Sequence, residues 1–461
     1  MKIYNTLTRS VEEFIPHEEG KVKIYTCGPT VYHYAHIGNM RNYINHDFFE
    51  KALRYLGYEV TRAMNITDVG HLTSDSDSGE DKMLKAVRRE HKTATEIAKF
   101  YTDAFFNDFE KVNCKKPDII VPATGEIDMY IKIIQKLLED EYAYEQGGNI
   151  YFDVSKLKDY YKLTNHKADD MVVGVRDGVE YDERKRNQAD FALWFTSSKF
   201  ENQELVWDSP FGRGYPGWHI ECSGISIKYL GEYLDVHGGG VDNIFPHHTN
   251  EIAQSESYLG HEWCKYWFHN EHLIEKDGKM SKSKGDILTV SKLEEDGYNP
   301  LSFRYMCLNT SYRKQLFFSF DALKSAENAY NKLKNKISNI KQDGELNQEE
   351  FDNYDNKFKS ELSNDLNMPN ALAVLYEVIN SDINGTTKLE LVKNFNKVFS
   401  LDLITKKEEN LDDKWILDLI EKRANAKKEK NYELADSIRK DLLDKGIELI
   451  DSREGTIYKI L

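Results

Sequence analysis

The sequence predicts an α/β protein with a central parallel sheet, followed by helical domains toward the carboxyl end. Three observations lead to this prediction. Residues 21–27, about 37–56 and 58–66 have the patterns of a strand, a helix and a strand, in that order. From about Phe318 onward, apolar residues recur at helical spacing. The length of 461 residues exceeds what one hydrophobic core organises, so roughly two to four domains are expected.

The first strand, helix and second strand predict a βαβ unit of the Rossmann type. Residues 21–27 alternate polar and apolar side chains, and the turn that begins at Gly28 places Cys27 at the carboxyl end of this strand. Gly57 ends the helix, and Thr67 follows the second strand. Parallel sheets bind ligands at the carboxyl ends of their strands, so a site is expected at this edge.

The string His36-Ile-Gly-Asn39 lies at or near the first turn of the predicted helix. Backbone N–H groups and the helix dipole favour an anion there. Gly38 would let a flat ligand approach the backbone closely. His36 and Asn39 could donate hydrogen bonds to phosphate oxygens. The other interpretation is a helix cap with a solvated histidine, and the string alone does not decide between them.

Residues 113–215 are expected to form an insertion into the sheet domain. This range contains a predicted helix at 127–141, a hairpin-like stretch at 147–153 and an apolar run at 190–194. Turn-forming residues at 207–216 then lead back to the sheet domain.

A possible metal site begins at Cys222. A glycine-rich turn is expected from His237 to Asp242, and Pro246 suits the first turn of a helix that ends at Gly260. His247 and Glu251 are four residues apart and share one face of this helix. A sulfur, an imidazole and a carboxylate form a zinc-type ligand set. The alternative is a solvated His/Glu pair beside a buried structural cysteine.

A basic loop follows the strand-like residues 266–274. Residues 277–285 place two glycines around three lysines and two serines, with the string Lys279-Met-Ser-Lys282-Ser at its centre. Such a loop can close over a polyphosphate and stabilise charge that develops in a displacement. A flexible basic surface turn is the alternative.

The carboxyl-terminal part is expected to be helical, with polar linkers at 341–356 and 405–413 and a small hairpin at 447–460. Positive charge gathers before the hairpin and favours RNA contact over a merely solvated face, because the whole chain has a formal net charge of −16. The residues of this basic cluster are Lys422, Arg423, Lys427, Lys428, Lys430, Arg439 and Lys440.

The composition excludes several classes of protein. A net charge of −16 argues against a general nucleic-acid binder, so any polyanion must meet a local basic patch. The 5 cysteines form no CxxC pair, which argues against a disulfide framework and favours a reducing cytoplasm. No apolar run reaches membrane-spanning length, so no membrane partner is expected.

Two of these strings, His36-Ile-Gly-Asn39 and Lys279-Met-Ser-Lys282-Ser, resemble the signatures of the class I aminoacyl-tRNA synthetases. Further motifs narrow the resemblance to the cysteinyl-tRNA synthetase family, over the whole chain. They are Cys27-Gly-Pro-Thr-Val-Tyr, Asn65-Ile-Thr-Asp68, Gly217-Trp-His-Ile-Glu-Cys-Ser223, His237-Gly-Gly-Gly240, Pro246-His-His-Thr-Asn-Glu251, Asp436-Ser-Ile-Arg-Lys-Asp-Leu and Gly446-Ile-Glu-Leu-Ile-Asp.

The resemblance implies one zinc ion per chain, magnesium with ATP, and roles for particular residues. His36, Gly38 and Asn39 would bind ATP, and Lys279 and Lys282 would bind it and stabilise the transferring phosphate; His36, Asn39 and both lysines would be the catalytic residues. The implied zinc ligands are Cys27, Cys222, His247 and Glu251, with His247 chosen over His248 by the family pattern. The implied cysteine-pocket residues are Thr67, Trp218, His237 and Asp242.

The resemblance also implies a domain organisation and partners. A class I catalytic domain would span 1–317, with the insertion at about 113–215 and the basic-loop region at about 275–317. A helical bundle would span 318–405, and a small anticodon-recognition domain 406–461. The partners would be ATP, L-cysteine and a cysteine-specific tRNA. The sequence does not fix the oligomeric state, although a monomer is favoured. The chain departs from the family pattern at His33, Phe195 and Tyr215, which puts polar contacts at those positions in doubt.

The implied activity is ATP-dependent ligation of L-cysteine to tRNA through cysteinyl-adenylate. Cysteine and serine differ by one atom, and shape alone rejects serine weakly. We therefore hypothesise that zinc reads the substrate thiolate, since a coordinated thiol loses its proton. One alternative is an ATP-dependent cysteine ligase that acts on a small amine acceptor. Another is a non-catalytic module that binds zinc and a nucleotide.

Overall fold

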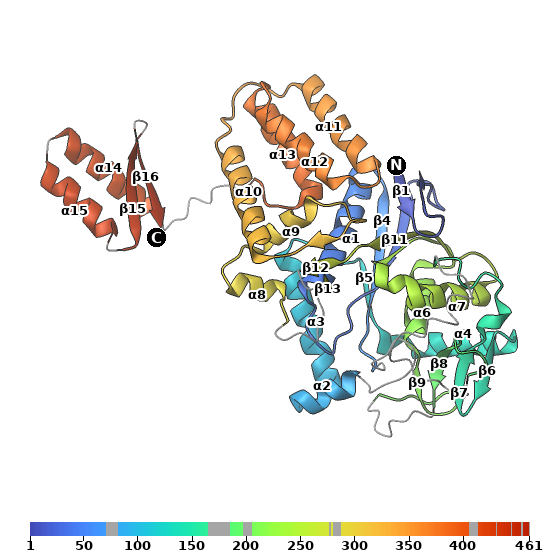
Figure 1. Ribbon diagram of the computed structural model, residues 1–461. Coiled ribbons are helices and arrows are strands. Elements are labelled where there is room, and N and C mark those ends of the chain that lie inside the picture. The colour runs from blue at the N-terminus through green and yellow to red at the C-terminus, as the bar shows by residue number, and fades with distance from the viewer. Residues whose placement is uncertain are drawn as a thin grey trace. The chain divides into compact units, whose positions relative to one another are not determined.

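The chain forms two compact units, Met1–Leu403 and Ile404–Leu461 (Figure 1). The structure is a computed structural model, and it describes residues 1–70, 82–164, 185–196, 205–275, 278–279, 287–404, 414–429, 431–443, 445–452 and 455–460.

A five-stranded parallel sheet organises the larger unit, in the order β11-β10-β3-β4-β5. The predicted βαβ unit is confirmed, because β3 and β4 pair in parallel and α1 connects them. The elements are β3 (Lys21–Thr26), α1 (Ile37–Tyr55), β4 (Glu59–Ile66), β5 (Ile119–Pro122), β10 (Leu234–Gly240) and β11 (Cys264–Asn270).

Both faces of this sheet are covered, as its alternating side chains require. Val22 and Ile24 of β3 belong to a core with the apolar side chains of α1. Tyr25, which lies between them, points into a second core with α4 (Ile127–Glu139) and α6 (Trp218–Leu230). Figure 1 shows α1 on one side of the sheet, and α4, α6 and α7 (Thr249–Leu259) on the other.

The range 113–215 contributes to two sheets. Its first strand, β5, pairs with β4 in the parallel sheet, so the separate part begins after Pro122. A four-stranded antiparallel sheet follows, and its first two strands form the hairpin expected near 147–153. Its strands are β6 (Ala143–Gln146), β7 (Asn149–Phe152), β8 (Phe191–Phe195) and β9 (Tyr215–Pro216).

The expected glycine-rich turn at 237–242 is wrong, because His237 to Gly240 lie within β10. The strand tolerates these glycines because neighbouring rings lie where side chains would project. A Cβ atom on Gly238 would come within 2.6 Å of the His46 ring, and one on Gly239 within 2.6 Å of the His248 ring. After β10 a short π-helical turn, Ile244–His248, leads into α7, and Gly260 caps α7 in the left-handed conformation.

Shorter elements complete the larger unit. Strands β12 (Leu273–Glu275), β13 (Gly278–Lys279) and β14 (Leu316–Phe317) form a small sheet, and β1 (Lys2–Asn5) pairs with β2 (Ser10–Glu13). The remaining helices before the bundle are α2 (Lys82–Glu90), α3 (Ala94–Lys111), α8 (Val290–Glu295) and α9 (Pro300–Leu308).

Four helices form a bundle that shares one core with α1 and the sheet. They are α10 (Phe320–Ser338), α11 (Gln348–Ser363), α12 (Met368–Asn380) and α13 (Gly385–Phe399). The polar linker expected at 341–356 is too long, because Asn347 caps α11 and the helix occupies its second half. Polar residues there face solvent on a helix.

The smaller unit contains α14 (Lys414–Lys428), α15 (Tyr432–Leu443) and the expected hairpin of β15 (Ile447–Ser452) and β16 (Gly455–Ile460). Ile438, Leu442 and Ile447 are among the residues of its own small core. Among the described residues of both units, no helix combines the length and the apolar character that crossing a membrane requires.

Candidate active site

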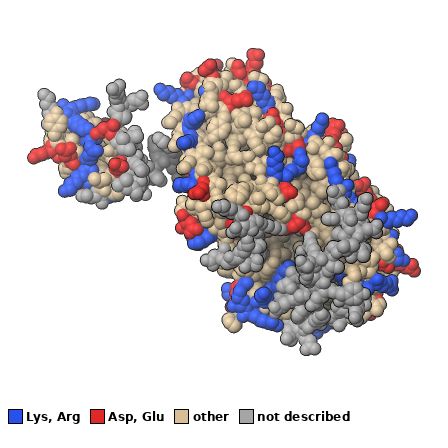
Figure 2. Space-filling model, in the orientation of Figure 1, with Lys and Arg blue, Asp and Glu red and all other residues tan. Residues whose placement is uncertain are grey.

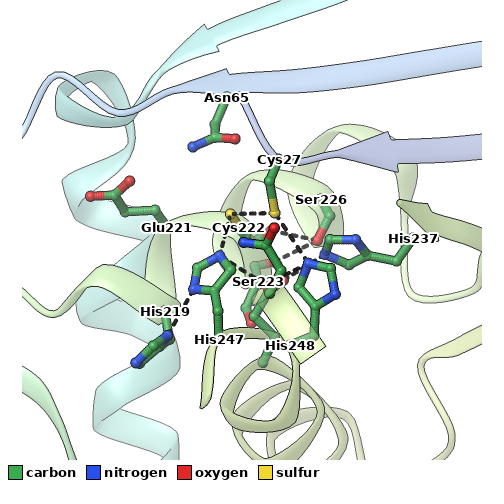
Figure 3. A network of polar contacts seen from close by, with 12 residues as sticks. Cys27, Asn65, His219, Glu221, Cys222, Ser223, Ser226, His237, His247 and His248 are labelled. Carbon is green, nitrogen blue, oxygen red and sulfur yellow. Dashed lines mark hydrogen bonds and ion pairs between the residues drawn. The ribbon is translucent and has the colours of Figure 1, made fainter. Parts of the chain in front are cut away.

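Four side chains from distant parts of the chain converge at the carboxyl edge of the parallel sheet. Cys27 follows β3, and Cys222 lies on α6. His247 lies in the π-helical turn that precedes α7, and Glu251 lies in the first turn of α7. One ligand atom of each lies within 4.8 Å of those of the other three, and all four side chains are buried except the half-buried Cys27. Figure 3 shows the two sulfur atoms facing each other, with the rings of His247 and His248 below them.

The spacing of these atoms fits a tetrahedral zinc ion. Zinc bonds of about 2.3 Å to sulfur and about 2.0–2.1 Å to nitrogen or oxygen place tetrahedral ligands about 3.8 Å apart for S–S, about 3.6 Å for S–N and about 3.4 Å for N–O. The Cys27 and Cys222 sulfurs are 3.9 Å apart. Cys222 Sγ lies 3.6 Å from His247 Nε2, and that nitrogen lies 3.1 Å from Glu251 Oε1.

A second combination, Cys27, His237, His248 and Glu251, is also close enough to be considered. His237 Nε2, however, lies 2.7 Å from Glu251 Oε2, which is a hydrogen-bond distance and too short for two ligands of one ion. Glu251 Oε1 is buried and accepts no hydrogen bond from the described residues. The geometry therefore favours the set with Cys222 and His247, with His237 orienting the Glu251 carboxylate.

Further ring contacts support the histidines of the site. His247 Nδ1 faces His219 Nδ1 at 2.8 Å, and the ring of Trp218 stacks on that of His247 at 4.3 Å. His248 Nε2 lies 3.3 Å from Cys27 Sγ, while its Nδ1 faces His269 Nε2 at 2.8 Å. Such contacts fix the ring orientation of metal ligands.

His219 and His269 were not singled out from the sequence. The sequence did contain one signal for them, a concentration of histidines, since half of the 14 histidines lie between 219 and 272.

Burial keeps the acidic groups of the site protonated, so a bound divalent cation would displace their protons. Burial raises the pKa of Glu251 to about 8, although His247 acts in the opposite direction. Burial also raises the pKa of the Cys27 thiol, and raises that of Cys222 well above its usual range. Burial lowers the pKa of His237 to about 3. A divalent ion binds the deprotonated forms of thiols and carboxylates and the neutral form of imidazole. It would therefore stabilise the charged forms of Glu251 and the two cysteines, and the neutral histidines are already in the form that binds.

Two of the four predicted cysteine-pocket residues, Trp218 and His237, contact the proposed zinc ligands. The Trp218 ring stacks on the His247 ring, and His237 Nε2 lies at hydrogen-bond distance from Glu251 Oε2. Thr67 is buried, and its hydroxyl donates to Glu221 Oε2 at 3.0 Å. Asp242 is exposed just after β10.

The first turn of α1 is a capping box. The Asn39 N–H group donates to His36 Nδ1, and the His36 N–H group donates to Asn39 Oδ1. A Cβ atom on Gly38 would come within 2.9 Å of the His36 ring, so glycine is needed there for the cap itself. The Ile37 N–H group donates to Leu288 O. The N–H groups of Ile37 and Asn39, which were expected to favour an anion, therefore already have partners. The string forms a helix cap, as one interpretation expected, and the Asn39 amide group is the donor that the other interpretation, an anion site, would use.

The two ends of the predicted basic loop lie beside this turn. Lys279 of β13 pairs with Ile274 of β12, and Leu273 lies 3.7 Å from the position of a Cβ atom on Gly38. Leu288, beyond the loop, contacts Ile37 as described above. Lys282 lies outside the described residues, as does the Lys279 side chain.

The Arg41 side chain links α1 to two other segments of the larger unit. Its side chain is buried, and its guanidinium donates to backbone carbonyls before β12 and after α9. The acceptors are Glu271 O at 2.6 Å, His272 O at 2.5 Å, Lys314 O and, more weakly, Ser311 O at 3.5 Å.

Two of the three departures from the family pattern face each other. Phe195 and Tyr215 are Cα partners across β8 and β9, and their rings stack 5.0 Å apart with 23° between the planes. Both side chains are buried, so an aromatic pair occupies these two positions. The third, His33, lies 5.9 Å from the Tyr101 ring, and its Nδ1 accepts from the Tyr34 N–H group.

One member of the basic cluster in the smaller unit is structural. Arg423 is 2% exposed and forms two hydrogen bonds to Asp451, at 2.8 and 2.9 Å. Lys427 also pairs with Asp451, and Lys430 lies outside the described residues. Arg423 is thus unavailable for the RNA contact expected from the sequence.

Comparison with known proteins identifies the family to which this chain is similar. The family described as tRNA synthetases class I (C) catalytic domain matches residues 13–328. A protein of Treponema denticola named cysteine–tRNA ligase is 45% identical to this chain over 100% of both chains. A protein of Borreliella burgdorferi with the same name is 44% identical and covers 100% of this chain and 99% of its own length.

A solved structure shares the fold at low sequence identity. Methionyl-tRNA synthetase of Mycobacterium tuberculosis, in complex with methionyl-adenylate, matches with a TM-score of 0.57 and 14% identity. The match covers 83% of this chain and 90% of that one.

Proposed function

Since this chain belongs to the cysteine–tRNA ligase family of class I tRNA synthetases, we propose that a zinc ion held by Cys27, Cys222, His247 and Glu251 selects its amino-acid substrate. The enzyme joins L-cysteine to tRNA with ATP as the energy source. The observation that carries the zinc proposal is the convergence of these four donors at tetrahedral spacing. A zinc ion, when bound, would favour a ligand that readily forms a thiolate over one with a hydroxyl group.

The reaction has two steps. In the first, a carboxylate oxygen of cysteine attacks the α-phosphorus of ATP, which forms cysteinyl-adenylate and releases pyrophosphate. In the second, a ribose hydroxyl of the terminal adenosine of tRNA attacks the carbonyl carbon and releases AMP. We propose the 2′-hydroxyl as this acceptor.

We propose that the first turn of α1 holds the phosphate end of ATP. The Asn39 side-chain oxygen is used in the cap, which leaves its amide group as the donor to ATP. Lys279 and Lys282 would stabilise the charge on the transferring phosphate, and magnesium would accompany the phosphates. The backbone supports this placement, because β12 and Leu288 both adjoin α1.

Trp218, Thr67, His237 and Asp242 would form or border the cysteine pocket. The stacking of Trp218 on His247 supports this, since it links a pocket wall directly to a proposed ligand. For the domains we propose 1–317 as catalytic, with an insertion, 318–405 as a helical bundle, and 406–461 as the reader of the anticodon. A cytoplasmic, monomeric enzyme is part of the proposal.

The testing experiment combines charging with metal analysis. Purified enzyme is incubated with ATP, cysteine and tRNA, and its zinc content is measured alongside. We expect cysteine-dependent charging and about one zinc per chain, with zinc lost in Cys222→Ser. Cys307→Ser is the matched control, because Cys307 is buried in a different core. Equal zinc content in Cys222→Ser and wild type would refute the ligand set. Condensation of cysteine with a small amine, without tRNA charging, would instead support the alternative ligase.

A further inference from the structure

A group of exposed aromatic rings lies beside the active site. Tyr34 precedes α1 and is 38% exposed, and Phe100 of α3 is 42% exposed. The two ring centroids are 6.0 Å apart. Both rings pack edge-on against the buried Tyr101, at 4.9 and 5.1 Å. Tyr101 thus holds the two exposed rings in place while part of each remains available to solvent.

Basic side chains lie near these rings, and two of them, Arg89 and Lys92, share the acid Glu90 at 2.7 and 4.0 Å. Lys92 Nζ lies 4.8 Å from the centre of the Phe100 ring. The Lys92 and Arg89 side chains are 45% and 43% exposed, and Lys85 is exposed on the same helix as Arg89. In α2, Lys82, Lys85, Arg88 and Arg89 outnumber the single acid, Glu90, although the whole chain carries a charge of −16. Figure 2 shows basic side chains gathered over α2, at the lower left of the larger unit.

A continuous series of contacts leads from this group to the proposed zinc ligands. The Arg89 guanidinium donates to Tyr32 O at 3.1 Å and to the Tyr101 hydroxyl at 3.3 Å. Lys82 Nζ lies 5.8 Å from the Tyr32 ring and 6.0 Å from the ring of Trp218, which stacks on His247. The exposed rings therefore lie along a wall that begins at the amino-acid site.

We propose that Tyr34, Phe100, Lys85, Arg89 and Lys92 form an aromatic–basic platform that binds the unpaired 3′-terminal nucleotides of tRNA. This inference rests on the proposed function, because it assigns a surface to its tRNA substrate. Unpaired bases stack on aromatic rings, whereas bases inside a duplex offer no free face. The lysines and the arginine attract the phosphates of the same strand. Since the terminal adenosine must reach the cysteine carboxyl group, the strand has to pass close to Trp218.

The test crosses a protein change with a tRNA change. Binding of full-length tRNA and of a tRNA that lacks its four unpaired 3′ nucleotides is measured for wild type, Phe100→Ala and Tyr34→Ala. Loss of one stacking contact corresponds to a decrease in affinity of about fivefold or more. We expect this decrease for full-length tRNA and no more than about twofold for the shortened tRNA, whose unpaired bases are absent. An equal effect on both tRNAs, or on neither, would overturn the platform.

Kinetics provide a second readout. We expect the KM for tRNA in charging to rise at least about fivefold in Phe100→Ala and to return toward wild type in Phe100→Trp, which restores a stacking surface. Tyr233→Ala is the matched control, because Tyr233 is 50% exposed at the amino end of β10, away from the catalytic edge. Tyr233→Ala should charge as wild type. A rise in KM in Tyr233→Ala equal to that in Phe100→Ala would contradict the assignment.

The basic residues are tested by salt dependence. Lys85→Gln and Lys92→Gln should each reduce the slope of log affinity against log salt by about 1, since each removes a phosphate contact. Lys332→Gln, on the exposed side of α10, is the control. Unchanged slopes in both platform variants would refute the basic part of the proposal. If wild-type enzyme fails to charge tRNA with cysteine at all, the proposed function is refuted. If Phe100→Ala charges tRNA with wild-type kinetics, only the platform is refuted.

Discussion

Replacement of Arg41 by methionine should weaken the larger unit and the ATP site together. Arg41 lies two residues after Asn39 on α1, and it donates to carbonyls that flank β12 and the turn after α9. The first of these segments leads into the basic loop, and the second precedes β14, which pairs with β12. Methionine has a similar length and volume but donates no hydrogen bond, so the variant isolates the guanidinium contacts.

The expected loss of stability can be worked from the contacts. Three of the four hydrogen bonds are short, with Glu271 O at 2.6 Å, His272 O at 2.5 Å and Lys314 O as acceptors. Hydrogen bonds from a charged donor contribute about 1.5 kcal/mol each at the lower end, or about 4.5 kcal/mol together. Burial of the apolar methionine side chain, together with water that enters to bond the freed carbonyls, offsets about 1 kcal/mol of this loss. We therefore expect a loss of about 3–4 kcal/mol.

The assay is urea unfolding followed by tryptophan fluorescence, beside ATP–pyrophosphate exchange. Five of the 6 tryptophans lie in the larger unit, so the signal reports mainly on it. We expect Arg41→Met to raise the KM for ATP several-fold at temperatures where it stays folded. Arg41→Lys keeps one charge and fewer donors, and should lose about half as much stability. A loss below about 1 kcal/mol together with an unchanged KM for ATP would refute the reasoning.

Three further predictions follow from other parts of the structure. Lys282→Ala should lower the rate of adenylate formation far more than it weakens cysteine binding, and equal losses in exchange kinetics and in cysteine titration would contradict the assigned role. Asp47→Asn should cost about 3 kcal/mol in urea unfolding at pH 7, because Asp47 Oδ2 lies 2.6 Å from Arg304 Nη2 with both side chains buried. Burial tends to raise the pKa of Asp47, but Arg304 and Lys51 bring it below its usual range. Its stabilisation is therefore present above the unfolded pKa of about 3.9 and is lost as pH falls through the lower folded pKa. The gap between wild type and Asp47→Asn should close in acid, and a gap independent of pH would exclude this origin. Removal of residues 404–461 should spare ATP–pyrophosphate exchange and abolish charging, whereas loss of both activities would mean that this unit supports the catalytic fold.

The elements with strong local patterns could be predicted from the sequence. Alternation in residues 21–27 and the glycine stop at Gly57 locate β3 and α1 closely. The His237–Gly240 strand was missed because glycines usually signal a turn. Here they admit the rings of His46 and His248 from other elements, which is a tertiary reason that no local pattern carries.

The candidate site was predicted to a similar extent. Spacing alone places His247 and Glu251 on one face, and the carboxyl end of β3 places Cys27 at the right edge. The supporting contacts of His219 and His269 could not be predicted, because they depend on how α6 and β11 pack around α7. The pairing of Phe195 with Tyr215 likewise depends on the register of β8 and β9.

The most direct test of the central claim is the ratio of kcat/KM for cysteine over serine in ATP–pyrophosphate exchange, measured on wild type and Cys222→Ser with zinc quantified in both. A pocket that reads shape alone discriminates by about 100-fold for a change of this size. We predict a ratio well above about 1,000 for the zinc-loaded wild type, and a fall toward that shape-only value in the zinc-depleted variant. A Cys222→Ser enzyme that lost its zinc yet kept the wild-type ratio would contradict the claim.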